Sequence, residues 1–96
     1  MAEMTGSPFI SFVIPAYNEE REILHCLESV RRSCDECCEV IVVDNNCTDA
    51  TTKVASRLAD RVISCAAQGI SAARNEGAAQ ARGKWIAFVD ADARLC

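Results

Sequence analysis

Two aspartates near the end of the sequence have the spacing of a metal-binding pair. Asp90 and Asp92 are two residues apart, and in an extended segment side chains with this spacing point to the same side. Two neighbouring carboxylates repel each other unless a cation lies beside them. Their oxygens suit Mg²⁺ or Mn²⁺, which can in turn bridge phosphates. An Asp-x-Asp sequence also arises by chance, so this interpretation depends on where the fold places it.

Two further charged residues stand where a ligand could use them. Asp44 directly follows an apolar run, where a carboxylate loses hydration unless it has a partner. It can bind a ligand or close a turn, and the sequence leaves both roles open. Arg74 falls in the first turn of an expected helix, where a cation is favourable if an anion binds nearby. The alternative is an exposed Arg74 paired with Glu76.

The elements that would position these residues alternate between strand and helix. The strands are continuous apolar runs, which is typical of a parallel sheet covered by helices on both faces. Thr48 is the expected N-cap of the second helix, and Gly83 the stop after the third. We predict strands at residues 9–14, 40–43, 61–65 and 85–89, and helices at about 20–33, 49–59 and 71–81.

This alternation predicts an α/β fold, a Rossmann-like three-layer αβα arrangement with one parallel sheet. Right-handed crossovers favour the strand order 3-2-1-4. Ligands of such sheets bind beyond the carboxyl ends of the strands, where the order reverses. That point lies between the first and fourth strands and would bring Tyr17 beside Asp90.

The composition excludes several classes of function. The 96 residues contain 10 Lys and Arg against 14 Asp and Glu, a net charge of −4, so no basic face for nucleic acid is expected. No apolar run reaches the roughly 18–20 residues that span a bilayer. The start resembles no secretory signal, which predicts a cytoplasmic protein. Dinucleotide and phosphate-loop motifs need an early glycine, and none occurs between Pro8 and Gln68.

Seven cysteines are present, and the tightest group is Cys34, Cys37 and Cys38. A structural zinc site would want a second close pair, which Cys26 and Cys47 do not supply. Without a secretory signal we interpret the cysteines as free thiols in a reducing compartment. Spacing alone leaves zinc or a disulfide as alternatives.

Four segments together resemble the successive blocks of a family 2 glycosyltransferase with the GT-A fold, in order from about Phe9 to Asp92. The resemblance implies a partial GT-A fold at residues 9–96, after a loose tail at 1–8. This part would be the donor half, which binds a nucleotide-diphosphate sugar, most often a UDP-sugar, for inverting transfer. The segments are residues 13–19 (VIPAYNE), 42–49 (VVDNNCTD), 73–77 (ARNEG) and 83–92 (GKWIAFVDAD).

The resemblance also implies roles for particular residues. Asp44 would accept a hydrogen bond from uracil, and Arg74 would lie near the base and the diphosphate. Asp92 would ligate Mn²⁺ or Mg²⁺, with Asp90 facing the ribose or the metal shell. The metal would neutralise the departing nucleoside diphosphate. The residues expected to line the nucleotide-sugar pocket are Pro15, Ala16, Tyr17, Glu19, Asp90 and Ala91.

The sequence departs from the family pattern in two places. Where the family often has Asp-Asp-Gly-Ser, this chain has Asp44 followed by Asn45, Asn46 and Cys47, which leaves the choice of nucleobase open. The family's acceptor region and catalytic base follow the Asp-x-Asp block, so we assign no catalytic residue and expect this chain alone to be inactive. The alternatives are a non-catalytic nucleotide- or metal-binding module and a fragment that self-associates through an exposed sheet edge.

Overall fold

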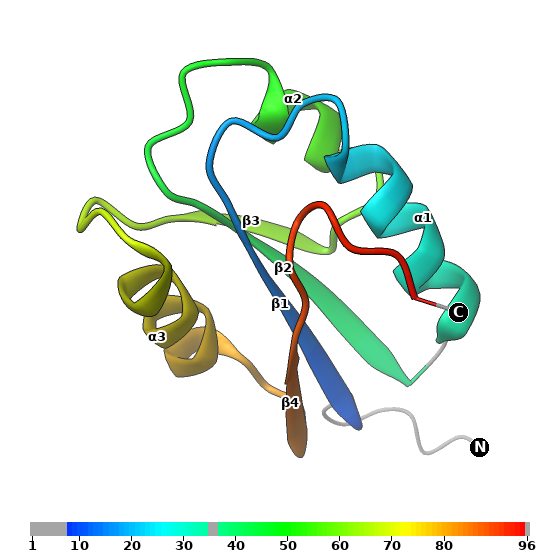
Figure 1. Ribbon diagram of the computed structural model, residues 1–96. Helices are drawn as coiled ribbons and strands as arrows, with labels where there is room; N and C mark the ends of the chain where they lie inside the picture. The colour runs from blue at the N-terminus through cyan, green and yellow to red at the C-terminus, as the bar shows by residue number, and fades with distance from the viewer. Residues whose placement is uncertain (1–7, 35–36, 96) are drawn as a thin grey trace.

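Four parallel strands form one sheet in the order β3-β2-β1-β4 (Figure 1). This order confirms the prediction made from the crossovers. The structure, a computed structural model, describes residues 8–34 and 37–95, so most of the expected tail at 1–8 lies outside the described residues. The strands are β1 (Ile10–Ala16), β2 (Cys38–Asp44), β3 (Arg61–Ser64) and β4 (Trp85–Phe88).

Helices cover both faces of the sheet, which confirms the three-layer arrangement. They are α1 (Ile23–Ser33), α2 (Thr51–Ala55) and α3 (Ile70–Gln80). Helices α1 and α2 lie on one face and α3 on the other (Figure 1). Side chains of β1 alternate between the two layers. Ile14 packs with Ile23 of α1 in the larger core, and Val13 packs with Ala73 of α3 in the smaller one.

Strand β1 continues through Pro15, two residues beyond the expected end of the strand. Pro15 lies in register with Val43 of β2. The ring nitrogen cannot donate a hydrogen bond, so proline normally interrupts a sheet. The backbone polar groups of Val13 and Pro15 point to the same side of β1, the side of β4. The Val13 carbonyl accepts from the Val89 backbone N–H, and the β1–β4 pairing ends at Phe88. Pro15 therefore faces a stretch without a strand partner and costs no ladder bond.

Two helices begin later than expected. Residues before Ile23 form turns, and Glu19 accepts from the backbone N–H of Ile23 through its carbonyl. Helix α2 is also shorter than predicted, and the expected N-cap Thr48 is wrong. The N-cap is Ala50, and the carboxylate of Asp49 before it accepts from the Thr51 backbone N–H at 3.0 Å. Among the residues described, no helix is both long and apolar enough to cross a membrane.

Strand β4 is an exposed edge, although its apolar run predicts a buried strand. Trp85 is 58% exposed, Ile86 41% and Phe88 48%. Within residues 8–34 and 37–95, β4 pairs along one edge only, with β1, since the sheet order places β4 at the end. The apolar run alone does not reveal this exposure, whereas the predicted strand order already places this strand at the edge of the sheet.

Candidate functional site

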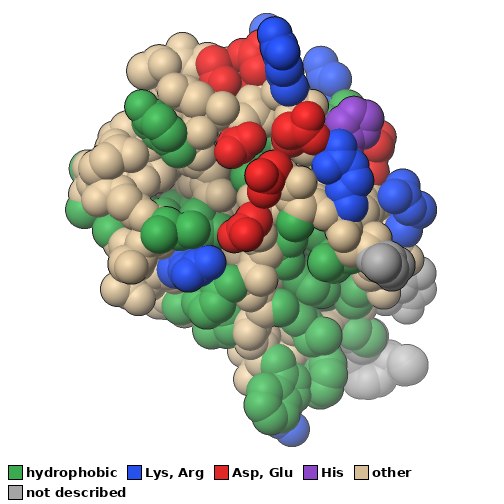
Figure 2. Space-filling view, viewed as in Figure 1, with side chains coloured by type: hydrophobic (Ala, Val, Ile, Leu, Met, Phe, Trp, Pro, Cys, Tyr) green, Lys and Arg blue, Asp and Glu red, His purple; other side chains and the backbone are tan. Residues whose placement is uncertain are grey.

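A pocket of about 380 Å³ lies at the carboxyl ends of β1 and β4. This is where the strand order reverses, as expected for an open α/β sheet. Asp and Glu side chains gather in a row across this face of the molecule (Figure 2). The lining residues are Pro15, Ala16, Tyr17, Glu19, Asn45, Gln68, Gly69, Ile70, Asp90, Ala91 and Asp92.

The pocket brings together all of the predicted site residues except two. Asp44 and Arg74 are not among its lining residues. Asp44 accepts from the backbone N–H of Cys47 at 2.8 Å, which is the turn-closing geometry left open by the sequence. Its binding of a nucleobase stays a prediction.

Four lining residues were missed by the sequence analysis: Asn45, Gln68, Gly69 and Ile70. Asn45 directly follows Asp44 and shares the same strand end, which was an available signal. Gln68 and Gly69 belong to the connection between β3 and α3, and Ile70 is the first residue of α3, so their contribution depends on how that connection folds back. Gly69 has φ +123°, a left-handed value that favours glycine, and it directly precedes α3.

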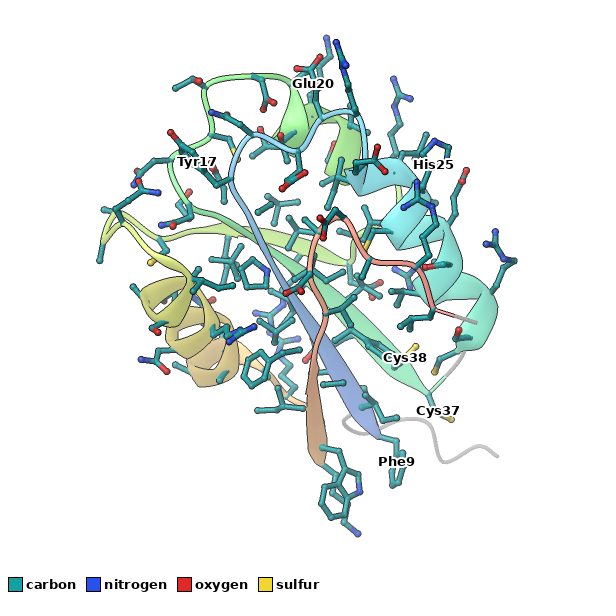
Figure 3. The ribbon with its side chains drawn as sticks, viewed as in Figure 1. Phe9, Tyr17, Glu20, His25, Cys37 and Cys38 are labelled. Carbon is teal, nitrogen blue, oxygen red and sulfur yellow. The ribbon has the colours of Figure 1, made fainter. Side chains whose placement is uncertain are left out.

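The segment after β1 turns sharply at Asn18, which has φ 52°. The Asn18 side chain accepts from the Thr48 backbone N–H at 2.8 Å, so this turn is tied to the connection after β2. The Glu19 N–H donates to Thr51 Oγ1 at 2.8 Å. These bonds place Glu19 at the pocket and leave the Tyr17 ring 54% exposed at its rim (Figure 3).

Negative charge accumulates on one side of the pocket. Burial raises the pKa of Glu19 above its usual value, and the charges of Asp92, Glu22 and Asp49 raise it further. Asp92 therefore repels Glu19 across the pocket. A bound cation would relieve this repulsion, which is the electrostatic setting expected of a site for a divalent metal.

Arg74 of α3 approaches the pocket from outside its lining. Its guanidinium lies 3.6 Å from Asp90 Oδ1 and 5.7 Å from the centre of the Phe88 ring. The predicted alternative, a pair with Glu76, is therefore not what the structure has. The buried Nε of Arg74 has no hydrogen-bond partner among the described residues. Arg74 thus retains donor capacity beside an acidic pocket.

The donor set fits a divalent metal that takes only a few protein ligands. Within residues 8–34 and 37–95 there is no group of three or more His, Cys, Asp or Glu that could hold a metal alone. Asp90 already pairs with Arg74, so Asp92 is the less committed carboxylate. Mg²⁺ and Mn²⁺ accept such sites because phosphates and waters complete their shells.

The cysteine group lies elsewhere. Cys37 and Cys38 are at the opposite end of the sheet from Tyr17 (Figure 3). Burial raises the pKa of Cys38 to about 12, and the Cys34 thiol adds to the shift. The free cysteines of the described chain are Cys26, Cys34, Cys37, Cys38, Cys47 and Cys65.

Comparison with known proteins identifies relatives along nearly the whole chain. Residues 11–95 match Glycosyl transferase family 2. Glycosyltransferase AglE of Haloferax volcanii is 38% identical over 93 residues, which is 88% of this chain and 31% of that protein. The succinoglycan biosynthesis protein ExoO of Rhizobium meliloti is 36% identical over 89 residues, covering 88% of this chain and 26% of that protein.

Solved structures agree with these relatives. A mannosyltransferase from Pyrobaculum calidifontis, in complex with GDP-Man and Mn²⁺, matches with a TM-score of 0.81 and 28% identity, over 96% of this chain and 30% of that one. Glucosyl-3-phosphoglycerate synthase from Mycobacterium tuberculosis, in complex with Mn²⁺, UDP and glucosyl-3-phosphoglycerate, matches with a TM-score of 0.78 and 30% identity, over 88% of this chain and 33% of that one.

This chain spans about a quarter to a third of the length of these proteins. Within that span the sheet order, the position of the pocket and the sequence blocks agree with one another. The fold is the GT-A fold of these glycosyltransferases. The chain belongs to glycosyl transferase family 2.

Proposed function

We propose that this chain binds the donor of an inverting glycosyl transfer, a nucleotide-diphosphate sugar, and that UDP is the favoured nucleotide. The observation that carries this is the pocket at the β1–β4 switch point, with carboxylates on one side and Arg74 beside it. A nucleoside diphosphate would give Arg74 a second anionic partner beside Asp90 and would supply phosphate oxygens to share a metal.

The residues divide into base, phosphate and metal roles. The ring of Tyr17 and the side chain of Ile70 are exposed at the rim of the pocket and offer apolar faces for a planar base. Arg74 would bind the diphosphate, and Asp92 would ligate the divalent metal with Asp90 near it. When bound, the metal would neutralise charge on the departing nucleoside diphosphate. Asp44, which closes the turn after β2 through Oδ1, would accept a hydrogen bond from the base.

The two solved structures support a nucleotide-diphosphate sugar as the class of donor, but they contain different nucleobases. One is in complex with UDP and Mn²⁺, and the other with GDP-Man and Mn²⁺. We favour UDP because of the sequence blocks. Transfer to an acceptor by the whole protein remains part of the proposal.

Calorimetric titration of the chain tests this function. We expect UDP to bind with Mn²⁺ or Mg²⁺ present, GDP to bind more weakly, and chelation by EDTA to weaken both. UMP has one phosphate fewer and should bind more weakly than UDP. Absence of binding by both UDP and GDP with either metal would overturn the proposal. Tighter binding of GDP would retain the donor class and overturn the choice of UDP.

Self-association is a second candidate, and the exposed β4 edge favours it. Trp85 and Phe88 lie on an edge strand whose outer side has no strand partner in the described chain. Sedimentation equilibrium would reveal a concentration-dependent mass. Trp85→Lys, which adds a charge to the edge, should return the chain to a monomer. A monomer at every concentration contradicts this candidate.

A further inference from the structure

One wall of the pocket is a connection with few apolar contacts of its own. Residues 65–69 join β3 to α3, and Gln68 and Gly69 of this connection line the pocket with Ile70. Cys65 is buried, but the next three residues are exposed. Apolar packing therefore does not fix the shape of this wall, and polar bonds must do so.

Asn45 supplies those bonds from the end of β2. Its side-chain Nδ2 donates to the carbonyl oxygens of Cys65 at 3.1 Å and Ala67 at 2.8 Å. Its Oδ1 accepts from the Gly69 backbone N–H at 2.9 Å and from Gln68 Nε2 at 3.3 Å. Asn45 is only 3% exposed, and all four of its side-chain bonding positions are used.

The exposed neighbour Asn46 extends the same set of bonds. Its Nδ2 donates to the Ala66 carbonyl at 3.1 Å and to Gln68 Oε1 at 2.8 Å. We call the Asn45 and Asn46 side chains, with residues 65–69, the amide strap. The strap replaces the Asp-Gly pair of the family pattern with two carboxamides.

Only a carboxamide satisfies the partners of Asn45. The carbonyls of Cys65 and Ala67 can only accept hydrogen bonds, and the Gly69 N–H can only donate one. A carboxylate at position 45 would place an anionic oxygen against two carbonyl oxygens. It would take the Asn45 donor from the buried Cys65 carbonyl and leave the Ala67 carbonyl with the Cys65 thiol as a donor. The chemistry of the amide, rather than its size, is therefore what this wall requires.

We infer that Asn45 is a positioning residue, which holds the wall formed by Gln68, Gly69 and Ile70 in the shape that receives the donor nucleotide. This inference rests on the proposed function of the pocket. Asn45 acts through the wall, because its own polar atoms are occupied before any ligand arrives. A pre-shaped wall spares the nucleotide the entropic cost of ordering residues 65–69 on binding.

The test compares Asn45→Asp with the parent chain in calorimetric titrations of UDP with Mn²⁺. We expect the dissociation constant to rise about tenfold, because a buried hydrogen-bond set is broken. The control Gln80→Glu makes the same amide-to-carboxylate change at the far end of α3, where Gln80 bonds only the exposed Glu76 through its side chain. The control should bind UDP as the parent does.

The pH profile separates positioning from general damage. Protonation of the introduced carboxyl group returns one donor, so the ratio of the variant's dissociation constant to the parent's should fall as the pH is lowered. A ratio that stays near one at every pH overturns the inference. A raised ratio that does not respond to pH also overturns it, since the donor chemistry would then be irrelevant.

Hydrogen exchange in the parent chain gives a second measurement that needs no variant and no nucleotide. The Gly69 amide should exchange at least about tenfold more slowly than an unstructured amide before UDP is added. Unprotected exchange overturns the inference, even where Asn45→Asp fails to fold. If the parent binds neither UDP nor GDP, the proposed function fails, while Gly69 exchange still reports whether the amide strap exists.

Discussion

Arg74 and Asp90 face each other across 3.6 Å, and they join the third helix to the segment that follows the fourth strand. Arg74 also lies over Phe88, so its guanidinium has one polar and one aromatic neighbour. The buried Nε has no partner among the residues described. The ion pair with Asp90 therefore holds the Arg74 guanidinium in place without using all of the guanidinium's hydrogen-bond donors.

Removal of the Arg74 charge should weaken nucleotide binding. We expect Arg74→Gln to lose about 2 kcal/mol of UDP binding free energy, the typical value of a charge-assisted hydrogen bond. Arg74→Lys should recover only part of it, because a lysine lacks the planar fork. Calorimetry with the control Arg57→Gln, an exposed arginine after α2, measures the effect of net charge alone. Equal losses in both glutamine variants would assign the effect to net charge.

Asp92→Asn should remove most of the dependence of UDP binding on divalent cations. The substitution keeps the shape of the side chain and removes the charge that a metal needs. The dissociation constants of UDP measured with Mn²⁺ and with EDTA should therefore differ for the parent chain and be nearly equal for Asp92→Asn. Glu28→Gln, which removes a charge from an exposed site on α1, should behave as the parent does. A metal effect of unchanged size in Asp92→Asn would show that Asp92 is not a ligand.

The free energy of unfolding should decrease as the pH is lowered, because the ionised Glu39 side chain stabilises the fold. Burial alone would raise the pKa of this carboxyl, but hydrogen bonds from Ser11 Oγ and the Arg82 N–H, both 2.6 Å, and the charge of Arg61 bring it below the usual 4.5. Because the pKa of Glu39 is lower in the folded chain than in the unfolded chain, ionised Glu39 stabilises the fold at pH values above its unfolded pKa. This stabilisation is lost as the pH falls through its folded pKa.

Urea unfolding across the range from about pH 6 to pH 3 measures the Glu39 contribution. Glu39→Gln should cost about 2 kcal/mol at neutral pH. It should also flatten the decline of the free energy of unfolding below about pH 5. A decline as steep as the parent's would assign the acid sensitivity to other carboxyl groups.

Gly77→Ala should destabilise the chain although alanine favours helices. A Cβ at Gly77 would clash with Val13 Cγ1 and lie 3.0 Å from Val43 Cγ2, so α3 would have to move away from the sheet. We expect overpacking to cost about 2–3 kcal/mol, and the roughly 1 kcal/mol gained in helix propensity leaves a net loss of about 1–2 kcal/mol. Urea unfolding of the double variant with Val13→Ala should show a smaller loss than the sum of the single losses, because space is restored.

The sheet and the position of the site could be predicted because they depend on strong local signals. Four apolar runs separated by helical periodicity, with right-handed crossovers, leave few possible strand orders. The carboxyl ends of β1 and β4 then place Tyr17 and Asp90 at one pocket, and the structure confirms it. The start of α2 was mispredicted because Thr48 and Asp49 both suit a helix N-terminus.

Other features depend on partners that the local sequence does not reveal. Asn45 lines the pocket through bonds to residues more than about 20 positions away, and an Asn in a turn has no pattern that predicts such partners. The exposure of β4 is not visible in its own apolar run, and it becomes predictable only from the strand order, which places β4 at the edge of the sheet. Arg74 pairs with Asp90 rather than with nearby Glu76, because the sheet brings the distant carboxylate closer.

The pairing of β1 with β4 also sets the order in which the molecule can be assembled during synthesis. Ile10 lies beside Trp85, close to the opposite end of the chain, so β1 leaves the ribosome long before its second partner exists. Strands β3, β2 and β1 can associate first, with one edge of the central strand unprotected until β4 emerges. Arg74 and Asp90 meet only after that closure, so the pocket that Asp90 lines is completed only when β4 has joined the sheet.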